Sequence, residues 1–245
     1  MNNTSGKLFI ISTPIGNFED ITLRALSTLR DADVILAEDT RTTANLLKHY
    51  NIPRKEIISF FEGNEEKRHP EILNLLITGK NVALVSESGT PLVSDPGYKL
   101  IRELVSNGIK IETIPGPTAL VAALVVSGLP TNSFLFMGFL PKKSGKAKTI
   151  LENTKSALSA LSQCKSVILY ESPHRIVKTL QLVKDVFGEI DVVVARELTK
   201  IHEEVRREKV SQAIEYFTTT KPRGEFVLLF SIENYTSALP VISLG

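Results

Sequence analysis

Residues 8–17 read LFIISTPIGN, an apolar run that stops at a loop of proline and glycine. The same pattern recurs along the chain, where apolar runs lead to the loops 87–91, 94–97 and 115–118. Proline and glycine most often simply make turns, so one such loop by itself indicates no more than a turn. Ligands of open α/β sheets bind beyond the carboxyl ends of the strands. Several such loops at strand ends therefore favour a ligand site.

Short apolar runs alternate with helical patterns through the first half of the chain. The predicted strands are 8–12, 34–37, 57–60, 82–86 and 110–114, and the predicted helices include 21–29, 71–77 and 98–105. This alternation predicts an α/β domain with a mostly parallel, largely buried sheet.

The pattern restarts after the turn residues at 128–132, which predicts two α/β domains, residues 1–129 and 130–245. Strands are expected at 134–140, 166–170, 191–195 and 226–231, with helices near 147–161, 176–187 and 211–217. A mixed sheet with flanking helices fits this order. The tail after Glu233 is expected to be loosely ordered.

Composition narrows the class of protein. The 245 residues include a single cysteine, Cys164, which excludes an intrachain disulfide and argues against a structural zinc site. No signal-peptide pattern precedes residue 8, and the apolar helix candidate 119–126 is too short to cross a bilayer. A cytoplasmic protein is the expectation.

The net charge of +2 does not by itself indicate a nucleic-acid partner. Residues 141–160, however, carry five lysines, Lys142, Lys143 and Lys146 among them, against a single glutamate. This segment is either a solubilising surface or a contact for phosphate groups.

Nucleotide-binding fingerprints are absent from the expected places. No G-x-G-x-x-G follows residues 8–12, and the chain has no G-x-x-x-x-G-K-[ST]. These absences disfavour nicotinamide, flavin, ATP and GTP, so a different cofactor is expected.

Acidic residues lie at the expected ends of strands: Glu38, Asp39, Glu87 and Asp95. Each could hydrogen-bond a hydroxyl or amine of a cofactor, but Asp39 could equally cap a helix that begins at residue 40. Their spacing matches no known metal-ligand pattern, so no metal is predicted. Of the histidines, His49, His69 and His202 lie in polar stretches and are expected at the surface.

The segment 195–200, ARELTK, ends a predicted strand with two cations and a carboxylate. It is either an exposed, ion-paired edge or a site that recognises a negatively charged substrate through Arg196.

Taken together, the ordered motifs of this chain closely resemble one family. They are STPIGN at 12–17 with DIT at 20–22, AEDTR at 37–41, SGTP at 88–91 with DPG at 95–97, PGP at 115–117, YES at 170–172 and ARELTK at 195–200. The chain resembles the ribosomal RNA small subunit methyltransferase I family, a branch of the tetrapyrrole methylase-like enzymes, from about residue 7 to residue 231.

The resemblance implies a homodimer of two-domain α/β subunits that bind S-adenosylmethionine in the cleft between the domains. The implied reaction is 2′-O-ribose methylation of a cytidine in the decoding region of 16S ribosomal RNA. The implied cofactor-binding residues are Pro14, Gly16, Glu87, Gly89, Thr90, Pro117, Thr118, Ala119, Tyr170, Leu198, Gly224 and Glu225. Glu87 stands where relatives commonly have aspartate, which keeps the carboxylate and adds a methylene.

A ribose hydroxyl is a weak nucleophile, so a general base or a nearby cation would assist methyl transfer. The candidates for the base are Asp39, Glu171 and Glu197, with Arg41, Arg196 and Lys200 holding phosphate or the reacting oxygen. Lys142, Lys143, Lys146 and Arg196 are the predicted contacts to the RNA substrate.

Two other functions fit the sequence. One is a C-methyltransferase acting on a tetrapyrrole, and the other is a non-catalytic ribosome-assembly factor. The lysine-rich segment and the 37–41 and 195–200 motifs favour RNA over a tetrapyrrole.

Overall fold

The chain divides into two units, Met1–Thr118 and Ala119–Gly245. The computed structural model describes residues 5–161 and 164–232, so the tail expected after Glu233 lies outside the described residues. The division comes earlier than the boundary predicted after Leu129. The reason is helix α5 (Ala119–Ser127), which packs on the strands of the second unit instead of ending the first.

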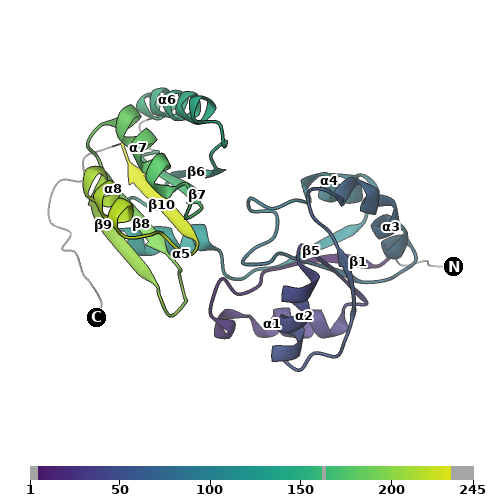
Figure 1. Ribbon diagram of the computed structural model, residues 1–245. Helices are drawn as coiled ribbons and strands as arrows, with labels where there is room; N and C mark the ends of the chain where they lie inside the picture. The colour runs from purple at the N-terminus through teal and green to yellow at the C-terminus, as the bar shows by residue number, and fades with distance from the viewer. Residues whose placement is uncertain (1–4, 162–163, 233–245) are drawn as a thin grey trace. The chain divides into compact units, whose positions relative to one another are not determined.

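The first unit is a parallel sheet with helices on both faces (Figure 1). Its strands are β1 (Lys7–Ile11), β2 (Val34–Ala37), β3 (Glu56–Ser59), β4 (Val82–Val85) and β5 (Lys110–Ile114), in the order β3-β2-β4-β1-β5. Its helices are the 3₁₀ turn η1 (Phe18–Asp20), α1 (Leu23–Asp31), α2 (Thr40–His49), α3 (Glu65–Ile77) and α4 (Tyr98–Ser106). All four strand pairings are parallel, as the βα alternation predicted.

The two faces of this sheet receive alternate side chains of each buried strand. In β2, Val34 and Leu36 join the core formed with α3 and α4, whereas Ile35 and Ala37 join the core formed with α1 and α2. Both β2 and β4 are fully buried, so their carboxyl ends and the loops that follow are held by packing on both sides.

The alternative that Asp39 caps a helix is confirmed, because Asp39 Oδ1 accepts hydrogen bonds from the backbone N–H groups of Arg41 and Thr42 at the start of α2.

The prediction that His69 lies at the surface is wrong. Its ring is buried between α3 and α4, with Nδ1 2.8 Å from Glu103 Oε2, because a polar helix face is covered by a neighbouring helix.

The second unit holds a mixed sheet. Its strands are β6 (Phe134–Phe139), β7 (Ser166–Glu171), β8 (Asp191–Arg196), β9 (Glu204–Lys209) and β10 (Phe226–Ser231), in the order β6-β7-β10-β8-β9. Only the β6–β7 pairing is parallel. Its remaining helices are α6 (Ser144–Ala160), α7 (Ile176–Phe187) and α8 (Val210–Thr219).

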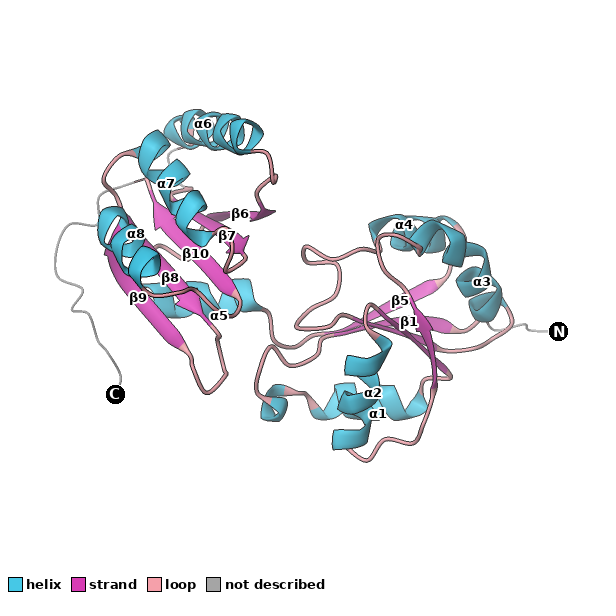
Figure 2. Cartoon of the chain, in the orientation of Figure 1, coloured by secondary structure: helices cyan, strands magenta, loops and turns pink. Residues whose placement is uncertain are grey.

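Figure 2 shows α6, α7 and α8 side by side over one face of this sheet. Val167, Leu169, Leu228 and Phe230 pack into the core beneath these helices. Helix α5 contacts β7, β9 and β10, and its apolar sequence suits its position against the sheet. Because its strand contacts lie in the second unit, α5 belongs to that unit, and the division falls before Ala119.

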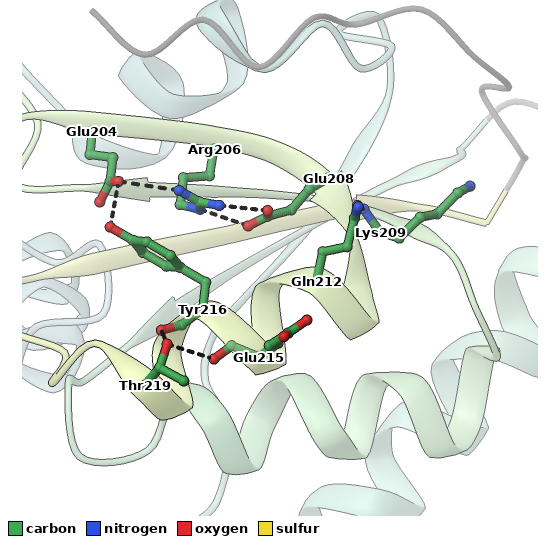
Figure 3. A network of polar contacts seen from close by, with 8 residues as sticks. All are labelled: Glu204, Arg206, Glu208, Lys209, Gln212, Glu215, Tyr216 and Thr219. Carbon is green, nitrogen blue, oxygen red and sulfur yellow. Dashed lines mark hydrogen bonds and ion pairs between the residues drawn. The ribbon is translucent and has the colours of Figure 1, made fainter. Parts of the chain in front are cut away.

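The edge strand β9 was not predicted, because its sequence EVRREK lacks an alternating apolar pattern. A network of polar contacts holds it to α8 (Figure 3). The Arg206 guanidinium lies 3.5 Å from the centroid of the Tyr216 ring, and it donates two 2.7 Å hydrogen bonds to Glu208. Tyr216 donates to Glu204 Oε1 at 3.0 Å. Charged side chains are a common protection of sheet edges.

Replacing Arg206 should loosen this edge. We expect Arg206→Ala to lower the free energy of unfolding by roughly 1–2 kcal/mol, since both the ring contact and the two-pronged carboxylate contact are lost. Urea unfolding measures the change. The control Lys148→Ala removes an exposed cation and should leave stability unchanged; equal effects of the two variants would show that the network contributes nothing.

Candidate functional site

The loops that follow β1, β4 and β5 are tied to one another at the carboxyl edge of the parallel sheet. Thr13 and Gly89 exchange backbone hydrogen bonds of 2.9 and 3.2 Å. The Thr90 hydroxyl donates to the Pro117 carbonyl at 2.9 Å, so it accepts from the Ser12 hydroxyl, also at 2.9 Å. Three loops distant in sequence thus form one junction.

Glycines allow the backbones to approach closely at this junction. Gly89 has φ +82°, and a Cβ there would lie 3.1 Å from the Ile15 side chain. A Cβ at Gly116 would lie 2.8 Å from Ser12 Cβ. Ser12 and Thr13 were not among the site residues predicted from the sequence. They could have been found from their position directly after the first buried strand and before the turn at Pro14–Gly16.

The other predicted cofactor residues of this unit lie on the same loops. Pro14 is buried beside Thr13, whereas Gly16 is exposed. Thr118 is the last residue of the first unit and follows Pro117, while Ala119 begins α5 in the second unit.

Three carboxylates lie close together beyond β2 and β4. Burial, followed by the negative charges of Glu38 and Glu87, raises the pKa of Asp95 from 3.8 to about 6. Burial and the charge of Glu87 raise the pKa of Glu38 as well. This edge of the sheet therefore concentrates negative charge, which favours a positively charged ligand. No group of residues within 5–161 and 164–232 has the arrangement of a metal site.

Asp39 does not share this environment. Hydrogen bonds from the backbone N–H groups of Arg41 and Thr42 lower its pKa, and the Arg41 charge adds to this. A lower pKa makes a weaker base, and the cap accounts for the presence of Asp39 at this position. Arg41 is exposed on the first turn of α2.

In the second unit, Glu171 is buried at the end of β7. Its Oε1 accepts from the Ser172 N–H at 2.7 Å, and its Oε2 accepts from the Thr179 hydroxyl at 2.6 Å. Arg175 Nε lies 3.4 Å from Oε1. Both oxygens are therefore occupied, so Glu171 fixes the first turn of α7 in this structure.

Glu197, Lys200, Gly224 and Glu225 form a clamp between two loops. Glu197 Oε1 accepts from Lys200 Nζ at 2.9 Å and from the Glu225 N–H at 3.0 Å, and Lys200 also contacts Glu225 Oε2 at 3.0 Å. Burial raises the pKa of Glu197, but these hydrogen bonds outweigh it and lower the pKa overall. Burial lowers the pKa of Lys200, but the hydrogen bonds to Glu197 and Glu225 and the charges of these carboxylates outweigh burial and raise the pKa overall. Both groups remain charged.

The remaining predicted residues of this unit fall into two settings. Arg196 Nη2 lies 3.1 Å from Glu204 Oε2, in agreement with the ion-paired-edge alternative, and the neighbouring Leu198 is buried. The Tyr170 hydroxyl accepts from the Leu120 N–H at 3.1 Å, in the first turn of α5. The structure thus joins Tyr170 to the first turn of the helix that begins at Ala119.

The three predicted RNA-contacting lysines lie together at the start of α6. Lys142, Lys143 and Lys146 are exposed, and none forms an ion pair with the residues that the structure describes. Their charges are therefore available to a ligand.

Comparison with known proteins decides the family. A family model described as Tetrapyrrole (Corrin/Porphyrin) Methylases matches residues 7–214. The ribosomal RNA small subunit methyltransferase I of Thermotoga maritima is 47% identical over 226 residues, which is 92% of this chain and 98% of that protein. The chain belongs to the ribosomal RNA small subunit methyltransferase I family. The protein of the same name from Hydrogenobaculum sp. is 46% identical over 93% of this chain and 96% of its own length.

Solved structures share the two-domain fold of this family member. Uroporphyrin-III C-methyltransferase from Thermus thermophilus, complexed with S-adenyl homocysteine, has a TM-score of 0.63 at 18% identity, over 92% of this chain and 97% of its own. A cobalt precorrin-4 methyltransferase has a TM-score of 0.63 at 22% identity, over 91% and 94% of the two chains. The predicted family and α/β fold class are both confirmed. In the described part of the chain, no helix combines the length and apolar character needed to cross a membrane.

Asp95 should make stability depend on pH. Because its pKa is higher in the folded state than in the unfolded state, Asp95 favours folding below about pH 4, and this contribution is lost as pH rises through 6. Asp95→Asn should therefore raise the free energy of unfolding at pH 8 by roughly 1 kcal/mol, a value reduced by solvent screening. Urea unfolding at pH 4 and pH 8 checks this; an equal gain at both pH values would contradict it.

Gly224 offers a matched test of the clamp. Its φ is +85°, and a Cβ would lie 2.3 Å from Glu197 Cδ, so Gly224→Ala should cost roughly 2 kcal/mol of stability and displace Glu197. At Gly145 in α6 a Cβ meets nothing within 4 Å, so Gly145→Ala should stabilise by up to about 1 kcal/mol. Thermal unfolding of both variants measures the difference. Equal melting temperatures would refute the clamp.

Proposed function

We propose that this chain transfers a methyl group from S-adenosylmethionine to the RNA of the small ribosomal subunit. Its target is the ribose 2′-hydroxyl of a cytidine in the decoding region of 16S ribosomal RNA, as the sequence motifs imply. The observation that carries the proposal is 41–47% identity, over more than nine-tenths of the chain, to proteins named ribosomal RNA small subunit methyltransferase I.

The junction at the parallel sheet fits S-adenosylmethionine. Gly89 and Gly116 let two loops pack closely on the loop after β1, and Thr90 fixes these loops relative to each other at the sheet edge where such folds bind ligands. S-adenosylmethionine carries a sulfonium and an ammonium group, so the negative charge of Glu38, Glu87 and Asp95 complements it. A methylase with this fold was solved with S-adenyl homocysteine, the cofactor without its methyl group.

When bound, S-adenosylmethionine supplies an electrophilic methyl group to a nucleophile that approaches in line with the carbon–sulfur bond. The protein's contribution is chiefly to hold the reacting groups in this alignment. The three predicted bases, Asp39, Glu171 and Glu197, are each held by hydrogen bonds, and the pKa values of Asp39 and Glu197 are lowered. These contacts support positioning roles for the three carboxylates.

The RNA would be held by cations of the second unit. Lys142, Lys143 and Lys146 are exposed and have no ion-pair partner among residues 5–161 and 164–232, whereas Arg196 and Lys200 are neutralised by carboxylates. The lysines are therefore the better candidates for phosphate contacts. The homodimer, the cytoplasmic location and the placement of the cofactor between the two domains stay predictions.

A tetrapyrrole substrate is the weaker alternative. The tetrapyrrole enzymes with this fold are 18–22% identical to the chain, a level that speaks for the fold and not for the substrate. The exposed lysines Lys142, Lys143 and Lys146 suit a polyanion such as RNA.

The decisive experiment transfers a radiolabelled methyl group from S-adenosylmethionine to small ribosomal subunits from cells that lack this protein. Label mapped to a single cytidine ribose is the expected result. Thr90→Val should weaken cofactor binding about tenfold, because the loops lose the hydroxyl that joins Ser12 to Pro117. Calorimetry with S-adenosylmethionine measures this loss.

The matched control is Thr218→Val, which removes an exposed hydroxyl from α8 and should leave both cofactor affinity and transfer unchanged. Cofactor binding without label on any RNA would contradict the proposed substrate. Absence of cofactor binding by the wild-type protein would contradict the enzymatic function and favour an assembly factor.

A further inference from the structure

The edge strand β6 ends in an exposed aromatic side chain, Phe139. Phe139 is 54% exposed, although its strand, β6, pairs with β7. The β6–β7 register shifts between Phe136 and Phe139, and Gly138 between them has φ +59°. Such bulges turn a side chain away from the direction that regular pairing would give it.

The Phe139 ring is held in place by its neighbours. Its centroid lies 5.7 Å from that of Tyr170, with the rings inclined at 61°, and Phe136 contacts the same tyrosine at 4.9 Å. The Tyr170 hydroxyl is in turn bound to the Leu120 N–H. An exposed ring that is already ordered loses little conformational entropy on binding a ligand.

Positive charge follows Phe139 directly in the chain. Lys142, Lys143 and Lys146 come within one short loop and the first turn of α6. Arg175 fixes the start of this loop, because its Nη2 donates to the Leu140 carbonyl at 2.7 Å while Nε faces the buried Glu171. The ring and the lysines are thus presented by one supported segment.

We propose that Phe139 is a stacking platform for one base of the RNA substrate, with Lys142 and Lys143 contacting the phosphates beside that base. This inference rests on the proposed function and names the part of the surface that receives the RNA. Proteins recognise single-stranded RNA by stacking unpaired bases on aromatic rings beside a basic track. The lysines favour a polyanion over a second copy of this chain, whose docking on Phe139 would have to bury these charges.

The experiment measures RNA binding by variants that remove the Phe139 ring, keep part of its volume, or change an aromatic residue elsewhere in β6. Phe139→Ala and Phe139→Leu should weaken binding to small ribosomal subunits and to polycytidylate roughly five- to hundredfold, whereas Phe139→Tyr keeps the ring and restores binding. Calorimetry with S-adenosylmethionine reports any displacement of Tyr170, which contacts Phe139, and the loss of RNA affinity should exceed any loss of cofactor affinity. The control is Phe134→Ala, which removes the partly exposed aromatic side chain at the opposite end of β6 and should bind RNA normally.

The lysines make a separate prediction within the same experiment. The double variant Lys142→Ala, Lys143→Ala should lower the slope of log affinity against log salt by about 1.4, since each phosphate contact to a single strand contributes about 0.7. An unchanged slope would show that Lys142 and Lys143 do not contact the phosphates.

The outcomes separate this inference from the function on which it rests. Wild-type affinity for polycytidylate in Phe139→Ala and Phe139→Leu would overturn the stacking role, even if methyl transfer to subunits is observed. If the Phe139 variants have a changed mass in sedimentation but unchanged RNA affinity, Phe139 instead packs against a second copy of the chain. Failure of the wild-type protein to label any RNA would refute the proposed function, while the polycytidylate comparison still decides the stacking role.

Discussion

The junction of hydrogen bonds between Ser12, Thr90 and Pro117, with the Thr13–Gly89 bridge beside it, organises the first unit. Parallel strands deliver their carboxyl ends to one edge of the sheet, but this alone leaves the following loops independent. The hydroxyl of Thr90 joins the loops into one surface because it can donate and accept at the same time. The absence of a Cβ at Gly89 and Gly116 lets these loops pack closely against one another.

In the second unit, carboxylates that look catalytic in the sequence are used to hold structure together. Glu171 fixes the start of α7 and Arg175, and Glu197 joins Lys200 to the loop of Gly224 and Glu225. Hydrogen bonds from Lys200 and the Glu225 N–H lower the pKa of Glu197, which makes it a weaker base. These contacts place cations and aromatic rings on supported segments, which suits a reaction that depends on alignment.

The sequence predicted most elements of the fold because buried parallel strands have strong, short apolar signals. It did not predict β9, whose charged side chains satisfy one another through Arg206, Glu208 and Glu204. The division of the units was also displaced, because α5 is apolar on all sides and nothing in its own pattern indicates which sheet it covers. Contacts between distant segments decided both points.

The sequence by itself determined the family, the α/β class and the loops of the candidate site, because ordered motifs and the βα alternation are local properties. Only the tertiary structure decided which polar groups are available. Asp39 is occupied as a helix cap and Glu171 is buried, while Lys142 and Lys143 remain exposed. Hydrogen bonds and burial depend on partners far along the chain, so the charge that a side chain offers to a ligand emerges only when the fold brings these partners together.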